Sequence, residues 1–209
     1  MKVDFSLYLI TDRHQIHPQH TLISAVTAAL QGGVQAIQLR EKDLSATELY
    51  RLGSALRELT NQYGAKLLIN DRIDIAMAVG ADGVHLTEQS LDVTCARTIL
   101  GNDKLIAVST HNLTSALHAE KQGADLITFS PIFFTPSKAA YGDPQGLEQL
   151  HTLCQQLKLP VFALGGITTQ RVAPVVAAGA TGVALISAIL AQENPCHAAA
   201  DFKISINQV

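Results

Sequence analysis

The chain has 209 residues, of which 47% are hydrophobic and 16% are charged, and its formal net charge is -3 at pH 7. This composition is typical of a folded domain, and the absence of a basic stripe argues against a nucleic-acid partner. Cys95, Cys154 and Cys196 match no metal-ligand spacing and indicate a reducing, cytoplasmic compartment. The N-terminal apolar run is too short for a signal peptide. The run at residues 172–190 is broken by proline and glycine, so we expect no membrane span.

Short apolar strand patterns alternate with amphipathic helical patterns along the whole chain. The strands are predicted near residues 6–11, 34–39, 65–69, 83–86, 104–108, 125–129, 160–164 and 182–186. The helices are predicted near residues 20–31, 45–63, 73–79, 92–100, 112–122, 147–158, 169–178 and 190–200. Ser45 is followed three residues later by Glu48, which predicts a capping box at the start of the second helix.

One helix-to-strand junction recurs at residues 31–37, 79–85, 122–127 and 178–184, where a glycine ends each helical pattern. The strands that follow are apolar without alternation, as in a parallel sheet covered on both faces. Eight strands alternating with eight helices predict an α/β fold, a single (β/α)8 TIM barrel over residues 1–209. A flavodoxin-like open sheet is the alternative, but it would normally use about five strands.

Polar residues gather where the predicted strands end, which is the catalytic face of such a barrel. Gly165 and Gly166 follow the seventh strand, and Ser187 follows the eighth. Free backbone N–H groups in these two loops commonly bind a phosphate, so the sequence predicts a phosphate site there. The alternative is that the glycines only permit a tight turn and that Ser187 only caps a helix.

A second anionic site is indicated by Arg40, Lys42 and Lys138, because Arg and Lys bind phosphate oxygens. Asp71 adds a carboxylate at a neighbouring strand end. A carboxylate beside a diphosphate is typical of a bridging Mg²⁺, so Asp71 is the candidate metal ligand. The structural alternative is an ion pair of Asp71 with Arg72 or with Arg40.

Two histidines lie at strand ends. His85 and His111 are each either a general acid or base or a hydrogen-bonded structural residue. His14, His17 and His20 are predicted to lie in a solvated loop rather than in a metal site.

Taken together and in order, six strand-end motifs resemble those of the thiamine phosphate synthase family and its sister group, the thiazole tautomerases. The motifs are Gln38-Leu39-Arg40-Glu41-Lys42-Asp43, Ile69-Asn70-Asp71-Arg72, Ala81-Asp82-Gly83-Val84-His85-Leu86, Val108-Ser109-Thr110-His111, Thr135-Pro136-Ser137-Lys138 and Leu164-Gly165-Gly166-Ile167. The resemblance extends from Tyr8 to Ile189. It implies a reaction that joins hydroxymethylpyrimidine diphosphate to thiazole phosphate, with Mg²⁺ helping diphosphate to leave.

The resemblance also implies a role for each matching residue. The pyrimidine and diphosphate end would be bound by Gln38 and Asn70, and the diphosphate by Arg40, Lys42 and Lys138, with Ser109 nearby. The implied catalytic residues are Arg40, Lys42, Ser109 and Lys138, and Asp71 is the implied Mg²⁺ ligand. The thiazole phosphate would be bound by Thr135, Ser137, Gly166, Ile186 and Ser187. The implied partners are therefore small phosphorylated substrates.

This chain departs from the family pattern after the fourth strand. The synthases usually have Gly-Gln-x-Asp there, whose Asp is a second Mg²⁺ ligand, whereas this chain has Thr87-Glu88-Gln89-Ser90. Glu88 or Asp92 is a hypothetical replacement. The tautomerases often lack that carboxylate too, but they use a His where this chain has Pro131. The synthase is therefore favoured, and a tautomerase or a barrel that binds a phosphorylated ligand without catalysis remains the alternative.

The sequence makes one expectation about movement and leaves one property open. The segment from Phe133 to Tyr141 is long and carries Lys138, so we expect it to close over bound substrate. The oligomeric state, including a homo-oligomer, cannot be read from the sequence.

Overall fold

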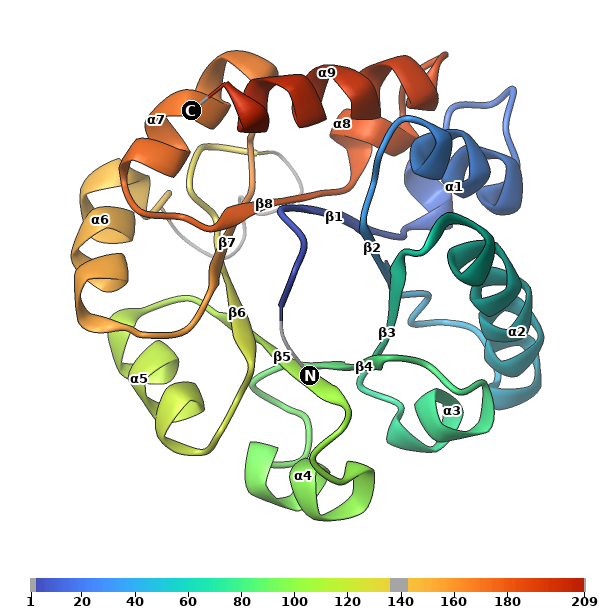
Figure 1. Ribbon diagram of the computed structural model, residues 1–209, viewed down its shortest axis with the longest axis horizontal. Coiled ribbons are helices and arrows are strands. Elements are labelled where there is room, and N and C mark those ends of the chain that lie inside the picture. The colour runs from blue at the N-terminus through green and yellow to red at the C-terminus, as the bar shows by residue number, and fades with distance from the viewer. Residues whose placement is uncertain (1–2, 136–142, 209) are drawn as a thin grey trace.

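The computed structural model describes residues 3–135 and 143–208. Within them, eight parallel strands pair in sequence order and close into a barrel surrounded by helices (Figure 1). The strands are β1 (Leu7–Ile10), β2 (Ala36–Leu39), β3 (Lys66–Asn70), β4 (Gly83–Leu86), β5 (Leu105–Thr110), β6 (Leu126–Phe129), β7 (Val161–Leu164) and β8 (Gly182–Leu185). The predicted (β/α)8 barrel is confirmed, and the open-sheet alternative is wrong because β8 pairs with β1.

Seven predicted helices are confirmed to within two residues at either end. They are α1 (Leu22–Gln31), α2 (Ala46–Tyr63), α3 (Ile73–Ala78), α4 (Val93–Leu100), α5 (Leu113–Lys121), α6 (Gly146–Gln156) and α7 (Thr169–Ala177). The predicted capping box at α2 is also present, with Ser45 and Glu48 each bonding the other's backbone N–H. In the described residues, no helix is both long and apolar enough to span a membrane.

The prediction of one helix over residues 190–200 is wrong. This region contains two helices, α8 (Ser187–Leu190) and α9 (Pro195–Asn207). The Asn194 side chain accepts a hydrogen bond from the backbone N–H of His197 at 3.0 Å, and Pro195 follows at the first helical position. Proline has no N–H and disfavours helical geometry in the residue before it, so a new helix begins here. A short 3-10 helix, η1 (Arg13–Gln15), lies in the loop after β1.

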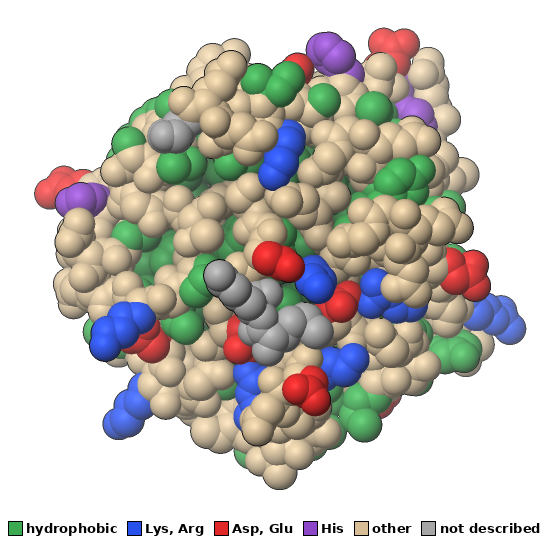
Figure 2. Space-filling model, in the orientation of Figure 1, with side chains coloured by type: hydrophobic (Ala, Val, Ile, Leu, Met, Phe, Trp, Pro, Cys, Tyr) green, Lys and Arg blue, Asp and Glu red, His purple; other side chains and the backbone are tan. Residues whose placement is uncertain are grey.

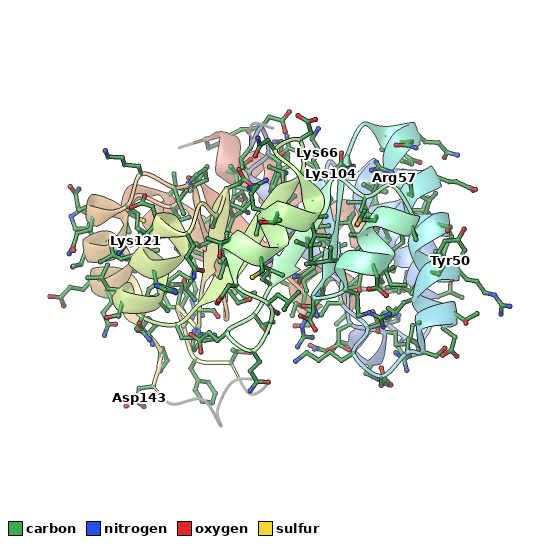
Figure 3. All side chains as sticks on the ribbon, turned by 90° about the horizontal axis from the view of Figure 1, so that it is seen from below. Tyr50, Arg57, Lys66, Lys104, Lys121 and Asp143 are labelled. Atoms are coloured by element: carbon green, nitrogen blue, oxygen red, sulfur yellow. The ribbon has the colours of Figure 1, made fainter. Side chains whose placement is uncertain are left out.

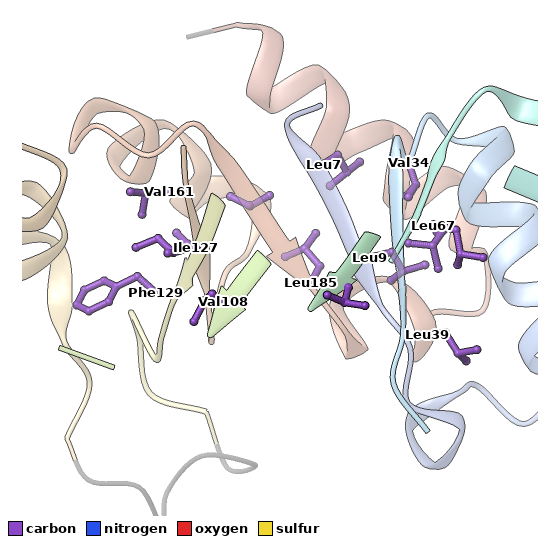
Figure 4. Close-up of a cluster of buried hydrophobic side chains, with 14 of the residues drawn as sticks. Leu7, Leu9, Val34, Leu39, Leu67, Val108, Ile127, Phe129, Val161 and Leu185 are labelled. Carbon is purple, nitrogen blue, oxygen red and sulfur yellow. The ribbon is translucent and has the colours of Figure 1, made fainter. Parts of the chain in front are cut away.

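The core has two layers because successive strand residues point to opposite faces of the sheet. Outward-facing side chains such as Leu9, Leu39 and Ile127 pack under the helices (Figure 4). Inward-facing apolar side chains fill the barrel: Phe5, Tyr8, Ile10, Ala36, Leu68, Leu105, Ala107, Leu126, Phe162 and Ala184. The same alternation places Gln38, Asn70 and Ser109 on the inner face, two residues after the inward-facing Ala36, Leu68 and Ala107.

The N-terminal end of the barrel is held by a repeated ion pair at the predicted helix-to-strand junctions. Arg57 pairs with Asp82 at 2.6 Å, and Arg97 pairs with Asp125 at 2.6 Å. Each carboxylate also accepts a backbone N–H from the neighbouring strand. The face that carries the N terminus accordingly shows basic and acidic side chains side by side (Figure 2). Lys66 and Lys104 lie at this end, and Asp143 lies at the opposite end (Figure 3).

Candidate active site

A cavity of about 260 Å³ opens at the C-terminal ends of the strands. It is lined by Ile10, Gln38, Arg40, Lys42, Asn70, Thr87, Glu88, Gln89, Ser109, His111, Ser130, Leu164 and Ile186. Six of the site residues predicted from the sequence meet here, although they come from four different strand ends. These six residues are Gln38, Arg40, Lys42, Asn70, Ser109 and Ile186. The barrel places them together because all of its strands end on this face.

Gln38 is the most buried of these polar side chains, with 2% of its surface exposed. Its side-chain oxygen has no hydrogen-bond partner in the described part of the chain. The end of β2 is held rigidly, because the backbone N–H of Arg40 donates to the buried Thr11 hydroxyl at 2.9 Å. A buried polar atom normally has a partner, so Gln38 is positioned to accept a hydrogen bond from a ligand.

Arg40 and Lys42 form a pair of cations on one side of the cavity. The nearby Arg40 charge lowers the pKa of Lys42, burial lowers it further, and Asp71 acts in the opposite direction. Two cations this close stabilise an anion placed between them more strongly than either would alone. Ser137 and Lys138, which are also predicted to bind phosphate groups, lie outside the described residues, as does most of the segment 133–141 that is expected to close over substrate.

Asp71 has a left-handed backbone with φ of 61°, and it is the one non-glycine with positive φ among the described residues. Its N–H donates to the carbonyl of His85 at 2.9 Å, which ties the end of β3 to β4. A non-glycine residue held in this conformation is uncommon and often marks a functional position. The predicted alternative, an ion pair of Asp71 with Arg72 or with Arg40, is wrong. Within the described residues Asp71 makes no ion pair, and Arg72 pairs with Asp74 at 2.5 Å.

The exposed carboxylate of Asp71 lines a second cavity, of about 340 Å³, beside the first. The two cavities share Lys42, Asn70, Thr87 and Gln89. The described residues contain no group of three or more His, Cys, Asp or Glu side chains that could hold a metal. A single carboxylate fits Mg²⁺, which commonly binds through one or two carboxylates together with substrate phosphates and water.

Ser90 occupies the position where the family pattern has a second carboxylate. Its hydroxyl accepts the backbone N–H of Thr87 at 2.8 Å and bonds the Thr87 hydroxyl at 3.1 Å. Ser90 therefore closes the turn before α4. Of the two hypothetical replacements, Glu88 lines the main cavity, whereas Asp92 stands at the N-cap of α4. Glu88 is the better placed of the two.

A third cavity, of about 110 Å³, lies between the ends of β7 and β8 and is lined by the predicted phosphate-binding residues. Thr135, Gly166, Ile186 and Ser187 all line it, as does Gln15 from the loop after β1. It shares Leu164 and Ile186 with the main cavity, so the two are neighbours. This cavity therefore contains every described residue that was predicted to bind the thiazole phosphate.

The two glycines of this third cavity have positive φ and lie too close to neighbouring atoms to carry a side chain. Gly165 and Gly166 have φ of 99° and 65°. A Cβ on Gly165 would lie 2.9 Å from Pro131, and one on Gly166 would lie 2.7 Å from the carbonyl oxygen of Phe134. The loop after β7 can therefore approach the loop after β6 only without side chains. Both glycines make a tight turn and also leave the backbone open toward the cavity.

Both predicted histidines lie at the site. His111 bonds the carbonyl of Ser130 through Nδ1 at 2.7 Å, so that nitrogen carries the proton. His85 faces the barrel interior and bonds Tyr8 and Ser109, each at 3.0 Å. Burial lowers the pKa of His85 to about 3, and the nearby Arg40 charge adds to the shift. His85 lies beneath the main cavity with both ring nitrogens hydrogen-bonded, which agrees with the structural alternative.

The sequence analysis missed Tyr8 and Gln15. Tyr8 was overlooked because it lies inside an otherwise apolar strand. A signal was present, since a tyrosine hydroxyl in a buried strand needs a hydrogen-bond partner. Gln15 gave no signal, because only the path of the loop after β1 brings it beside β8.

A closed (β/α)8 barrel whose polar and cationic side chains gather at the C-terminal strand ends is an enzyme of the barrel class. The sequence pattern of the family described as thiamine monophosphate synthase matches residues 7–189. The chain therefore belongs to the thiamine monophosphate synthase family.

Individual relatives agree with this family. A protein of Geobacter sulfurreducens named putative thiamine-phosphate synthase is 56% identical, and the match covers 93% of this chain and 91% of that protein. A thiamine-phosphate synthase of Desulfitobacterium hafniense is 43% identical over 95% of this chain and 96% of that protein. The solved structure of thiamine phosphate pyrophosphorylase from Pyrococcus furiosus superposes with a TM-score of 0.89 at 35% identity, covering 97% of this chain and 96% of that one.

Proposed function

We propose that this chain is a transferase that catalyses the thiamine-phosphate synthase reaction. The hydroxymethylpyrimidine group moves from its diphosphate to the ring nitrogen of thiazole phosphate, which gives thiamine phosphate and diphosphate. The observation that supports this is a pair of adjoining cavities that share Leu164 and Ile186. One is lined by cations and the other by glycine backbone, which suits two phosphorylated substrates held side by side. The relatives with this name match the chain over nearly its whole length.

The breaking C–O bond leaves negative charge on the diphosphate. In our proposal Arg40 and Lys42 face that charge, since both line the main cavity. Fixed cations stabilise a transition state best where its charge develops. Lys138 belongs to the same proposal. Asp71 would hold Mg²⁺, which when bound supplies further positive charge to the diphosphate oxygens.

The other residues of the proposal bind and orient the substrates. Gln38 would accept a hydrogen bond from the pyrimidine, using its buried oxygen, and Asn70 would bind beside it. Thr135, Gly166 and Ser187 would hold the thiazole phosphate, together with Ile186 and Ser137. Holding the thiazole nitrogen against the reacting carbon replaces an encounter in solution by a local step.

One observation favours the alternative functions, namely the neutral Ser90 where the family pattern has a carboxylate. The tautomerase alternative also requires a histidine at the start of the loop after β6. That position is the buried Pro131, and neighbouring His111 is tied to the Ser130 carbonyl. The synthase is therefore the function that the geometry supports best.

The direct test mixes purified protein with hydroxymethylpyrimidine diphosphate, thiazole phosphate and Mg²⁺, and measures thiamine phosphate and diphosphate. We expect turnover, and we expect Arg40→Ala to lower kcat/KM at least about 100-fold, as loss of a charged transition-state contact does. Arg51→Ala is the matched control, because Arg51 lies exposed on α2. Folded wild-type protein without turnover would overturn the proposal and direct the search to tautomerisation or to ligand binding alone.

A second experiment asks which group completes the metal site. We expect Glu88→Gln to raise the Mg²⁺ concentration needed for half-maximal activity, whereas Asp92→Asn should leave it unchanged. Glu88 lines the cavity with Lys42 and Asn70, and Asp92 does not. If Glu88→Gln also leaves the Mg²⁺ dependence unchanged, neither Glu88 nor Asp92 replaces the missing carboxylate.

We also propose that the enzyme acts in the cytoplasm. The three cysteines are free thiols in the structure, and burial raises the pKa of Cys154 to about 11. Free thiols persist in a reducing compartment. Fractionation of cells that express the protein would test this proposal, and recovery in an oxidising compartment would contradict it.

A further inference from the structure

A hydrogen-bonded chain of three side chains crosses the barrel interior and ends at the main cavity. The hydroxyl of Tyr8 on β1 lies 3.0 Å from Nδ1 of His85 on β4. Nε2 of the same imidazole lies 3.0 Å from the hydroxyl of Ser109 on β5. Tyr8 and His85 are buried, with 0% and 1% of their surfaces exposed. Ser109 is the one member that lines the cavity.

The packing fixes where these side chains lie. The Tyr8 and His85 rings stack with centroids 5.9 Å apart, and Phe162 meets the Tyr8 ring edge-on at 6.0 Å. Phe5 closes the other side of the Tyr8 ring at 5.7 Å. The two phenylalanine rings pack against the buried Tyr8 ring and offer its hydroxyl no alternative polar partner.

Counting hydrogen-bond donors and acceptors shows which group donates in each of the two hydrogen bonds. A neutral imidazole has one donor nitrogen and one acceptor nitrogen, whereas an imidazolium has two donors. Within the described residues, the Tyr8 hydroxyl has no partner other than Nδ1. If Nδ1 carried the proton, the Tyr8 O–H would be left buried without an acceptor, which is unfavourable. The favoured arrangement is therefore Tyr8 O–H to Nδ1 and Nε2–H to the Ser109 oxygen.

Because His85 donates to Ser109, the Ser109 hydroxyl can act as a hydrogen-bond donor toward the cavity. Its oxygen already accepts a hydrogen bond from His85, so its own proton is free to donate into the cavity. Arg40 lines the same cavity and is close enough to shift the His85 pKa. A hydroxyl donor beside a guanidinium suits an anionic oxygen.

We infer that Tyr8 and His85 are positioning residues that hold Ser109 as a hydrogen-bond donor toward an oxygen of the diphosphate. The inference rests on the proposed function, because that function places a diphosphate in this cavity. Tyr8 and His85 touch no substrate in this arrangement and act through Ser109. The hydrogen bond from Ser109 would strengthen as the leaving diphosphate gains charge.

The first test measures binding of inorganic diphosphate in the presence of Mg²⁺, by calorimetry on the whole chain. We expect Ser109→Ala to raise the Kd about tenfold, because one hydrogen bond to a charged group is lost. We expect Tyr8→Phe to raise it about threefold, because the same hydrogen bond is weakened. The Tyr50→Phe variant is the matched control, since Tyr50 lies on the outside of α2 (Figure 3). An unchanged Kd in Tyr8→Phe would overturn the inference.

A double-mutant cycle separates positioning from simple structural damage. If Tyr8 acts through Ser109, adding Tyr8→Phe to Ser109→Ala should change neither the Kd nor kcat further. Full additivity of the two changes would overturn the inference. His85→Gln, whose side-chain amide can still donate to Ser109, should keep kcat within about threefold of wild type, whereas His85→Leu should resemble Ser109→Ala.

A spectroscopic measurement on wild-type protein tests which His85 nitrogen carries the proton, and it does not depend on whether a variant folds. The ¹⁵N chemical shifts of the His85 ring in wild-type protein should report a protonated Nε2 and an unprotonated Nδ1. The opposite tautomer would overturn the inference. Failure of the proposed function would look different, because wild-type protein would then show the expected tautomer but neither bind diphosphate nor turn over.

Discussion

Asp71 combines an uncommon backbone conformation with the proposed role of metal ligand. Its φ of 61° is a conformation that aspartate and asparagine tolerate better than other residues with a Cβ. The carboxylate at the same position faces the cavity that Lys42 also lines. Substitutions at Asp71 can therefore separate the effect of its positive φ from the effect of its carboxylate.

We expect Asp71→Asn to change the free energy of unfolding by less than about 0.5 kcal/mol, since asparagine also accepts positive φ. The same variant should lose most synthase activity at Mg²⁺ concentrations that saturate the wild type, because the negative charge is gone. Urea denaturation and a Mg²⁺ titration of activity measure the two effects. Asp71→Ala should lose both activity and about 1 kcal/mol of stability, and an Asp71→Asn enzyme with wild-type Mg²⁺ dependence would show that Asp71 is no ligand.

Gly166 gives a second prediction at this scale. A Cβ there meets the backbone oxygen of Phe134 at 2.7 Å, and the φ of 65° adds backbone strain. Gly166→Ala should lower the unfolding free energy by about 1–3 kcal/mol and raise the KM for thiazole phosphate. Gly64 has the same φ but no atom within 4 Å of an added Cβ, so it is a matched control. Gly64→Ala should lose about 1 kcal/mol and leave that KM unchanged, and equal KM values in both variants would contradict the proposed binding of thiazole phosphate at the third cavity.

At the scale of elements, the chain uses side-chain caps where a helix must start at a defined residue. Ser45 caps α2, and Asn194 caps α9, which lies against α1 and α7 around the outside of the barrel (Figure 1). The cap of α9 also accounts for the one helix that the periodicity predicted wrongly. The apolar pattern continues across residues 190–200, but the backbone chemistry of Asn194 and Pro195 interrupts it.

We expect Asn194→Ala to lower the unfolding free energy by about 1 kcal/mol, because the N–H of His197 loses its partner. Thr168 is a matched control, since it occupies the N-cap of α7 without a side-chain cap hydrogen bond. Thr168→Ala should change stability by less than about 0.5 kcal/mol. Thermal unfolding of both variants measures the difference, and equal losses would show that the Asn194 cap is unimportant.

At the scale of the whole molecule, burying a histidine inside the barrel makes stability depend on pH. The His85 pKa is about 3 in the folded chain, whereas an unfolded histidine titrates near 6.5. Between these values the unfolded chain binds a proton that the folded chain does not bind. The contribution of neutral His85 is therefore fully present above about pH 6.5 and is lost as the pH falls toward 3.

We expect the unfolding free energy to fall between pH 6.5 and pH 4 by up to about 1.4 kcal/mol per pH unit from this group alone. His85→Gln cannot take up a proton, so its stability should fall less steeply over the same range. Urea denaturation at pH 7, 5.5 and 4.5, without Mg²⁺, measures both slopes. Parallel slopes would show that His85 does not contribute.

Local patterns in the sequence were enough to predict the barrel and the face at which its main cavity opens. Eight strand patterns, each followed by a helical pattern, leave a parallel barrel as the simplest arrangement, because crossover helices cover the outer face of each strand. Once the fold is known, the strand-end rule predicts the catalytic face, and Arg40 and Lys42 do line one cavity there. Gln38, Asn70 and Ser109, which the family resemblance implied, line the same cavity. The predictions of the barrel and of its catalytic face depend on periodicity and chain order, which are local properties.

The tertiary structure alone decided the partners of the polar groups. Arg72 pairs with Asp74 and not with Asp71, and Ser90 closes a turn. His85 joins Tyr8, which lies 77 residues away in the sequence, to Ser109. The physical reason is that hydrogen bonds require ångström-scale geometry between strands distant in sequence, whereas apolar burial needs only the correct face. The sequence by itself therefore determined the barrel and its catalytic end, and the closed packing of the strands determined which side chains touch there.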